Sequence, residues 1–254
     1  MPNSAGAPLR AQWEAEETHG MEGWDFSHIA GRWDEPGPPW DYRRIVQAYL
    51  RDTDLLLDMG TGGGEVLLTL GHPHENTCVT EAWPPNLALC KERLAPLGVT
   101  VAQTFADDKL PFADECFDFI INRHESFDLS EVRRALKPGG VFVTQQVGNQ
   151  NAREFQLRLN DGLVTQSPSF TPENCAGELA RLGFRVILKD EALYPLRFFD
   201  VGALVFWARA CAWNFPGFSV QTHFGKLLQY QREAEEQGFL QGTGHRFLLA
   251  ARKA

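Results

Sequence analysis

The hydrophobic and polar positions after residue 54 alternate between two kinds of pattern. Short apolar runs that end in an acid, such as 55–58 and 77–81, are typical of strands buried in a parallel sheet. Between these runs, apolar residues recur every three or four positions, which predicts amphipathic helices. We therefore predict an α/β fold with a doubly wound, mostly parallel sheet of seven strands. The predicted strands are 55–58, 77–81, 99–105, 117–122, 141–147, 185–188 and 245–251.

Two regions depart from this alternation. Residues 198–240 hold one apolar and one amphipathic helical pattern, which predicts a helical insert before the last strand. The first forty residues have no clear period, and we expect the first twenty of them to be loose. Four aromatic residues are expected to mark a segment that packs on the main body, with a lid over a ligand site as the alternative: Trp24, Phe26, Trp33 and Trp40. The predicted organisation is a partly disordered N-terminal segment, 1–39, followed by one domain, 40–254.

Composition and charge narrow the class of protein. The chain has 254 residues, 43% of them hydrophobic, which is enough for one large domain or two small ones. Its five cysteines are widely spaced and indicate neither a disulfide framework nor a metal site. A net charge of -9 without a long basic run disfavours a nucleic-acid partner. The polar and acidic N-terminus has no apolar core of a signal peptide, and the longest apolar run, 201–213, is too short to span a bilayer. We therefore expect a cytoplasmic protein, and the sequence does not indicate an oligomeric state.

Alternate glycines follow the first predicted strand, in the order Asp58-x-Gly60-x-Gly62-x-Gly64. Glycine lets the backbone turn tightly and approach a ligand closely, and the helix that follows offers unpaired N–H groups. Glu81 ends the second predicted strand, where an acid accepts hydrogen bonds from the hydroxyls of a ribose. The combination indicates a nucleoside-bearing cofactor, with a merely tight strand–helix turn as the alternative. The spacing differs from the Gly-x-Gly-x-x-Gly fingerprint of NAD-binding proteins.

With these motifs, the chain resembles the class I S-adenosylmethionine-dependent methyltransferases, in particular those that act on small molecules. The resemblance covers roughly residues 40–150 and the last strand. It is carried by the glycine turn, by Glu81, by the Leu-Pro-Phe loop between Asp107 and Asp118, and by Leu136-Lys-Pro-Gly-Gly140. It implies a Rossmann-like methyltransferase fold with S-adenosyl-L-methionine as the cofactor.

The resemblance also implies roles for residues at matching positions. The three glycines would pass beneath the methionine and ribose parts of the cofactor, Asp58 would lie near its amino group, and Glu81 would hold its ribose. Ala82 would pack on the adenine, and Asp107 or Asp108 would accept a hydrogen bond from its amine. The predicted cofactor-binding residues are Asp58, Gly60, Gly62, Gly64, Glu81, Ala82, Asp107, Asp108, Asn122 and Arg123.

Candidate catalytic residues follow the fourth predicted strand, where open α/β sheets bind ligands. His124 would serve as a general base oriented by Glu125, because an unperturbed histidine titrates near neutral pH. A structural role for His124 is the alternative. Gln145 and Gln146 are candidates for hydrogen bonds to the methyl acceptor. The aromatic residues and His223 of the insert would either form a core or cover the acceptor.

The function predicted from these features is methyl transfer from S-adenosylmethionine to a small-molecule acceptor. An RNA or protein methyltransferase and a non-catalytic S-adenosylmethionine-binding module are alternatives. An NAD-dependent oxidoreductase is a more remote one, since the glycine spacing counts against it.

Overall fold

A computed structural model describes residues 6–21, 24–105 and 109–254, so the predicted adenine contacts Asp107 and Asp108 lie outside the described residues. The chain divides into two compact units, each made of segments that are far apart in the sequence. The first unit comprises Met1–Gly37, Asn149–Ser169 and Leu193–His245. The second unit comprises Pro38–Gly148, Phe170–Ala192 and Arg246–Ala254.

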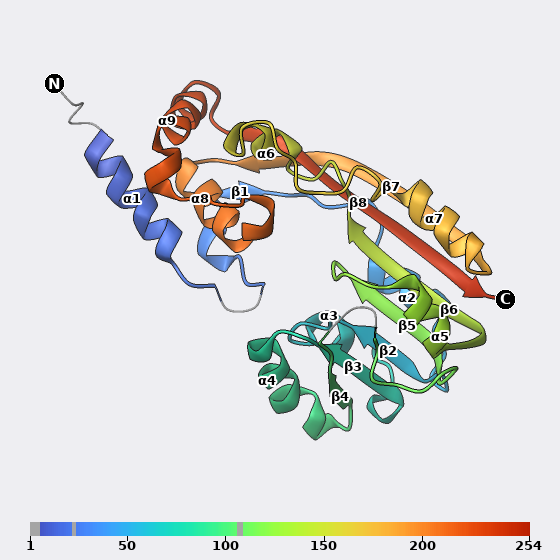
Figure 1. Ribbon diagram of the computed structural model, residues 1–254. Helices are drawn as coiled ribbons and strands as arrows, with labels where there is room; N and C mark the ends of the chain where they lie inside the picture. Colours follow the sequence, from blue (N-terminus) through green and yellow to red (C-terminus); the bar gives the residue numbers. More distant parts are fainter. Residues whose placement is uncertain (1–5, 22–23, 106–108) are drawn as a thin grey trace. The chain divides into compact units, whose positions relative to one another are not determined.

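The sheet has the strand order β1-β7-β8-β6-β5-β2-β3-β4 (Figure 1). The pairs β2/β3, β3/β4, β2/β5 and β5/β6 are parallel, and β8 is antiparallel to β6. The chain adds β3 and β4 on one side of β2 and then restarts with β5 on the other side. This change of direction lies between β2 and β5, and open α/β sheets bind ligands at the carboxyl ends of the strands at such a point. The strands of the parallel part are β2 (Leu56–Met59), β3 (Thr77–Glu81), β4 (Thr100–Gln103), β5 (Phe117–Arg123) and β6 (Leu136–Val147).

Helices cover both faces of this part of the sheet, because successive side chains of a strand point to opposite faces. In β6, Val143 lies in one buried cluster and Phe142 in the other. Helices α2 (Tyr42–Tyr49), α3 (Glu65–Leu68) and α4 (Pro84–Arg93) contribute to the cluster of Val143. Helices α5 (Leu129–Ala135) and α7 (Pro172–Arg181) contribute to the cluster of Phe142. The second unit is therefore a doubly wound, three-layer α/β structure, as predicted.

Side-chain caps begin helices α2, α5 and α7 of this unit, at Asp41, Asp128 and Thr171. Asp128 Oδ1 accepts hydrogen bonds from the backbone N–H groups of Ser130 and Glu131, at 2.8 and 3.0 Å. The Glu131 carboxylate does not turn back to Asp128 but accepts a hydrogen bond from Leu110 N and pairs with Arg134. Glu131 thus ties the chain before β5 to helix α5.

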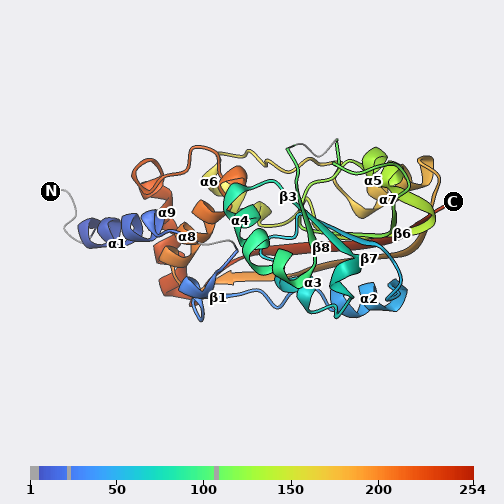
Figure 2. The same cartoon turned by 90° about the horizontal axis from the view of Figure 1, so that it is seen from below.

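The first unit is mainly helical. Helices α1 (Gly6–Thr18), α8 (Val201–Ala210) and α9 (Val220–Gln237) pack together (Figure 2), and α6 (Arg153–Leu159) joins their core. Trp13 and Phe206 are almost completely buried in this core. The two-residue strand β1 (Trp33–Asp34) pairs with the end of β7, and Arg32 forms an ion pair of 2.7 Å with Asp200, which caps α8.

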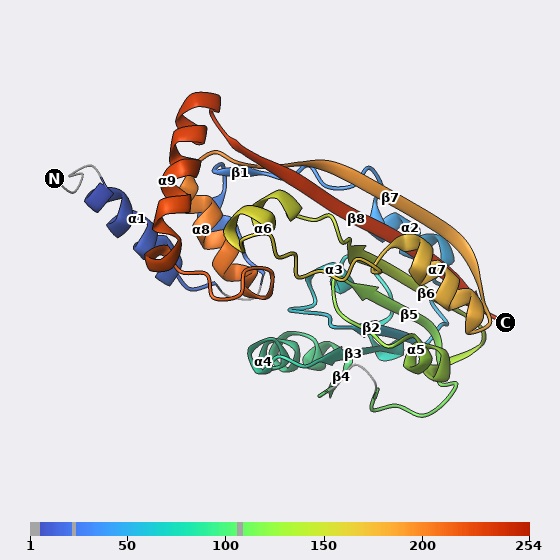
Figure 3. The same ribbon diagram turned by 45° about the horizontal axis from the view of Figure 1, so that its top comes forward.

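Strands β7 (Phe184–Phe198) and β8 (Leu240–Lys253) lie side by side (Figure 3), and each has residues in both units. They are much longer than the predicted 185–188 and 245–251. The short strand β1 is additional, so the described residues form a sheet of eight strands where seven were predicted. The helical insert is confirmed, since α8 and α9 lie between β7 and β8.

The N-terminal residues differ from the expectation in two respects. The segment expected to be loose contains helix α1, because α8 and α9 bury the apolar side of that helix around Trp13. Trp24, which was expected to be packed, is 57% exposed, whereas Trp33 packs against the core of the first unit. Among the helices in the described ranges, none is long and apolar enough to cross a bilayer.

Candidate functional site

The carboxyl ends of the parallel strands bring the predicted residues of the second unit together. In register, Met59 at the end of β2 pairs with Thr80 of β3 and with Asn122 of β5. Arg123 at the end of β5 pairs with Gln145 of β6. Residues that are distant in the sequence therefore meet at one edge of the sheet, at the point where the strand order changes direction.

The three predicted glycines all have positive φ angles, of 67°, 65° and 82°, which side chains rarely adopt. They differ in what a side chain would meet. A Cβ at Gly60 would collide with the side chain of Glu125, and a Cβ at Gly64 would lie 2.7 Å from Leu94 Cδ2. A Cβ at Gly62 would meet nothing within 4 Å. Gly60 and Gly64 thus allow close packing within the protein, while Gly62 borders open space.

Glu81 links the end of β3 to the glycine turn. Its buried carboxylate accepts hydrogen bonds from the backbone N–H groups of Gly62, Ala82 and Trp83, at 3.0, 2.9 and 3.0 Å. These bonds hold the turn and the start of α4 in a fixed relation. Oε1 accepts two of these bonds, and Oε2 accepts the third together with a long bond of 3.5 Å from Asn86 Nδ2, so a ligand hydroxyl would replace the Asn86 contact.

Asp58 carries a carboxyl group that is expensive to ionise in this position. It is 6% exposed, and burial raises its pKa to about 7, with the negative charge of Glu81 acting in the same direction and Arg123 opposing it. A cationic group bound beside Asp58 would favour the ionised form. The site therefore offers a buried acid that is matched to an amine.

Asn122 has an unpaired donor inside the protein. The residue is fully buried, and its Oδ1 accepts a hydrogen bond of 2.6 Å from Gln146 Nε2. Its Nδ2 has no partner among the residues that the structure describes. Because an unpaired buried amide is costly, this donor at the carboxyl edge indicates a ligand atom that accepts a hydrogen bond.

A small cavity lies at the same edge, between Gly60, Thr80, Ala82 and Glu125. Its volume of about 20 Å³ suits a single water molecule. Ala82 lines it as predicted, and the Glu125 side chain closes it on the side of Gly60.

Both the backbone and the ring of His124 contact Gln145. It has a left-handed backbone with φ of 62°, its N–H donates to Gln145 O at 2.9 Å, and its ring Nε2 lies 3.0 Å from Gln145 Nε2. The residue is exposed, yet its ring lies against protein atoms that displace water. This desolvation lowers the pKa of His124 well below its ordinary value, and the positive charges of Arg246 and Arg123 act in the same direction. The ring is therefore neutral near pH 7.

Sequence reasoning did not predict that Trp40 contacts Gln145 at this edge of the sheet. Its indole Nε1 donates a hydrogen bond of 2.8 Å to Gln145 Oε1. The two residues are 105 positions apart, so no local pattern connects them. Gln145 and Gln146, which were candidates for acceptor contacts, are both buried and bonded to protein side chains.

The candidate residues of the insert lie in the first unit and are mostly core. The ring Nε2 of His223 lies 3.1 Å from Leu159 O, and Trp213 is 60% exposed. The remaining aromatic residues are buried in the core of that unit, which favours packing over a role in lining a substrate site. They are Phe206, Trp207, Phe215 and Phe218.

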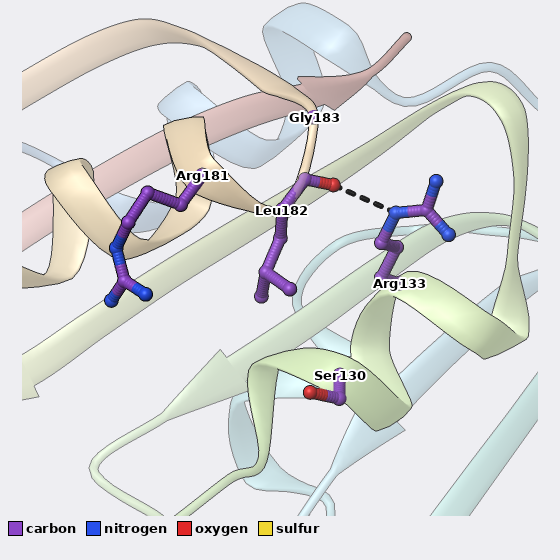
Figure 4. Close-up of a pocket in the computed structure, with 5 residues that line it drawn as sticks. All are labelled: Ser130, Arg133, Arg181, Leu182 and Gly183. Atoms are coloured by element: carbon purple, nitrogen blue, oxygen red, sulfur yellow. Dashed lines mark hydrogen bonds between the residues drawn. The ribbon is translucent and has the colours of Figure 1, made fainter.

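A larger hollow of about 500 Å³ lies elsewhere on the second unit, between α5 and α7 (Figure 4). Arg133 Nε donates to Leu182 O at 2.7 Å, and the guanidinium groups of Arg133 and Arg181 point apart. None of its lining residues lies at the carboxyl ends of β2, β3 or β5, and Gly183 directly precedes β7. The smaller cavity beside the glycine turn is therefore the candidate site.

Comparison with known families gives a match to a methyltransferase domain over residues 57–144. This segment contains the glycine turn, Glu81, Asn122 and His124. The segment 57–144 is a methyltransferase domain by this match.

Two curated proteins are similar to part of this chain. A "probable phthiotriol/phenolphthiotriol dimycocerosates methyltransferase" of Mycobacterium ulcerans is 33% identical over 110 residues, which are 40% of this chain and 42% of that protein. A ubiquinone/menaquinone biosynthesis C-methyltransferase of Burkholderia mallei is 31% identical over 114 residues, 40% of this chain and 46% of that protein. The chain thus spans less than half the length of the curated relatives that it matches.

Solved structures share the fold. A functionally unknown protein from Deinococcus radiodurans aligns with 99% of this chain and 100% of its own length, with a TM-score of 0.58 and 14% identity. The YcgJ protein of Bacillus subtilis aligns with 84% of this chain and 97% of its own length, with a TM-score of 0.55 and 16% identity.

Proposed function

We propose that this chain transfers a methyl group from S-adenosylmethionine to a small-molecule acceptor. Its residues 57–144 match the methyltransferase domain family, and its fold is that of the class I S-adenosylmethionine-dependent methyltransferases. The observation that carries the proposal is the link between Glu81 and Gly62 at the point where the strand order changes direction. It joins a ribose-binding acid to a glycine that borders open space.

The residues present fit the cofactor. Glu81 would accept from the ribose hydroxyls, the open side of Gly62 would admit the ligand against the backbone, and Asp58 would pair with the amino group. The unpaired Nδ2 of Asn122 would donate to a cofactor oxygen or nitrogen. When bound, S-adenosylmethionine supplies an electrophilic methyl group on a positively charged sulfur. The part of the protein is to orient the acceptor and to exclude water.

Two observations support a small-molecule acceptor. The net charge of -9 is unfavourable for RNA, whose phosphates bind clustered Lys and Arg. The names of the two curated relatives refer to quinone biosynthesis and to phthiotriol dimycocerosates, not to a macromolecule. An RNA or protein acceptor is the alternative within the same reaction class.

Two measurements test the proposal. Titration calorimetry should detect S-adenosylhomocysteine, the demethylated product, binding more tightly than NAD, and tighter binding of NAD would overturn the proposal. The full chain is then incubated with methyl-labelled S-adenosylmethionine and, separately, with small-molecule, RNA and protein fractions of a bacterial extract. Label should enter the small-molecule fraction. Label in RNA or protein alone would refute the acceptor class, and binding without any transfer would indicate a non-catalytic module.

A further inference from the structure

Three side chains of the second unit form a chain of hydrogen bonds at the carboxyl ends of β5 and β6. Trp40 Nε1 donates to Gln145 Oε1 at 2.8 Å, and Gln145 Nε2 lies 3.0 Å from His124 Nε2. An indole N–H can only donate, so the amide oxygen of Gln145 must face Trp40 and its NH₂ group must face His124. The NH₂ group can also only donate. The nitrogen Nε2 of His124 therefore accepts, and the proton of the neutral ring is on Nδ1.

The contacts of Gln145 hold His124 in one conformation. Gln145 is 4% exposed, and its backbone carbonyl accepts from His124 N at 2.9 Å, so it contacts both the backbone and the ring of His124. His124 has a left-handed φ of 62°, a conformation that residues other than glycine rarely keep unless their surroundings hold them. Backbone and side-chain contacts thus fix the position of the ring as well as its tautomer.

The other ring nitrogen, Nδ1, forms no hydrogen bond with the residues that the structure describes. Gln145 is the hydrogen-bond partner that the described residues give to the His124 ring, so the Nδ1–H group is left without a protein acceptor among them and can donate to a ligand. Arg123 and Arg246 lie close enough to act on the ring electrostatically, and their positive charges favour an electron-rich atom nearby. A ring with one lone pair in use and its other nitrogen protonated cannot take up a proton in this arrangement.

We propose that Trp40 and Gln145 are positioning residues that keep the proton of His124 on Nδ1, and that His124 donates a hydrogen bond from Nδ1 to an oxygen atom of the methyl acceptor. The acceptor class is then a molecule with a carbonyl, phenolate or carboxylate oxygen, and His124 orients it instead of acting as a base. The part of this proposal that concerns the acceptor rests on the proposed function; the part that concerns the tautomer does not.

The tautomer is measured by long-range ¹H–¹⁵N NMR on the full chain labelled at histidine nitrogens, near pH 7. The signal that disappears in His124→Asn identifies the ring. The Nδ1–H form should dominate, with the other tautomer at roughly a tenth or less of the population, because it lacks one hydrogen bond. A dominant Nε2–H form or a protonated ring would overturn the proposal.

Two variants test whether Trp40 and Gln145 set the tautomer. Gln145→Glu places an acceptor-only group beside the ring, so the proton should move to Nε2. Trp40→Phe removes the donor that orients the amide, so the two tautomers should approach equal populations. The control Trp24→Phe alters an exposed indole of the first unit and should leave the His124 signals unchanged. Unchanged signals in Trp40→Phe would refute the positioning role, even if Gln145→Glu failed to fold.

Acetophenone and isopropylbenzene, added in the presence of S-adenosylhomocysteine, test recognition of oxygen. They have similar shapes, and only acetophenone carries a carbonyl oxygen, which can accept but not donate. Acetophenone should move the Nδ1 signal of His124 more than isopropylbenzene does, and Gln145→Glu should abolish the difference. Equal effects of the two probes on the wild-type protein would overturn the oxygen assignment. Loss of S-adenosylhomocysteine binding with an unchanged tautomer would instead count against the proposed function alone.

Discussion

Adding one methyl group to Gly62 separates backbone strain from ligand contact at the glycine turn. Gly62 has a φ of 65°, and a Cβ there would meet no protein atom within 4 Å. The substitution Gly62→Ala therefore costs only the strain of a left-handed alanine, about 1 kcal/mol. In a chain of this size that corresponds to a fall of about 2–4 °C in Tm.

The added methyl group would occupy the space that we assign to the cofactor. Displacing the ligand from its contact with the backbone should weaken S-adenosylhomocysteine binding tenfold or more, which is about 1.4 kcal/mol. The assay is titration calorimetry of the folded variant, with Tm measured on the same sample by circular dichroism. The perturbation of binding should thus exceed what the loss of stability explains.

Gly139 provides a matched control. It lies in the turn at the start of β6, has a φ of 77°, and a Cβ there would also meet nothing within 4 Å. Gly139→Ala should lower Tm by a similar amount and leave S-adenosylhomocysteine affinity at the wild-type value. If the two variants bound the ligand equally well, the space beside Gly62 would not be the cofactor site, and the reasoning from the glycine turn would fail.

Three further predictions concern buried groups. Burial raises the pKa of Asp58 from 3.8 to about 7, so the folded state holds this proton more tightly and the unfolding free energy falls as pH rises between about 4 and 7. About two pH units of this fall lie above pH 5, so Asp58→Asn should remove a loss of about 3 kcal/mol between pH 5 and pH 8, measured by urea unfolding at both pH values. Glu81→Gln turns one acceptor that faces a backbone N–H into a donor. This change should lower the unfolding free energy by about 1–3 kcal/mol and weaken S-adenosylhomocysteine binding more than tenfold. The control Glu92→Gln, on the exposed side of α4, should change neither quantity. Trp13→Ala should destabilise the first unit by about 3–5 kcal/mol in thermal unfolding, because Trp13 is 1% exposed, and an equal effect of Trp24→Ala would contradict this account of helix α1.

Much of the second unit could be predicted because its signals are local. Apolar runs that end in an acid mark β2 and β3, and a capping aspartate marks the start of α5. The glycine turn and Glu81 are separated by about twenty residues, a spacing that one strand–helix–strand unit imposes. Each of these features depends on neighbours in the chain, so the order of residues is sufficient to find it.

The first unit could not be predicted in the same way. Helix α1 is stable because α8 and α9, almost two hundred residues later, bury Trp13, and the isolated segment shows no comparable pattern. The long continuations of β7 and β8 likewise depend on each other as neighbours in the sheet. Burial by distant segments is a tertiary effect that periodicity does not reveal.

The candidate site depends both on the order of residues and on tertiary contacts. Residue order alone places acids, glycines and a histidine at the ends of successive strands, because parallel strands must end at a common edge. Only the tertiary structure assigns their partners: Glu125 lies over Gly60, and His124 is held by Gln145, whose amide is oriented by Trp40 from 105 positions away. Hydrogen-bond direction depends on which donor faces which acceptor in space. The sequence therefore indicates which groups the site contains, and the fold decides which of them accept and which of them donate.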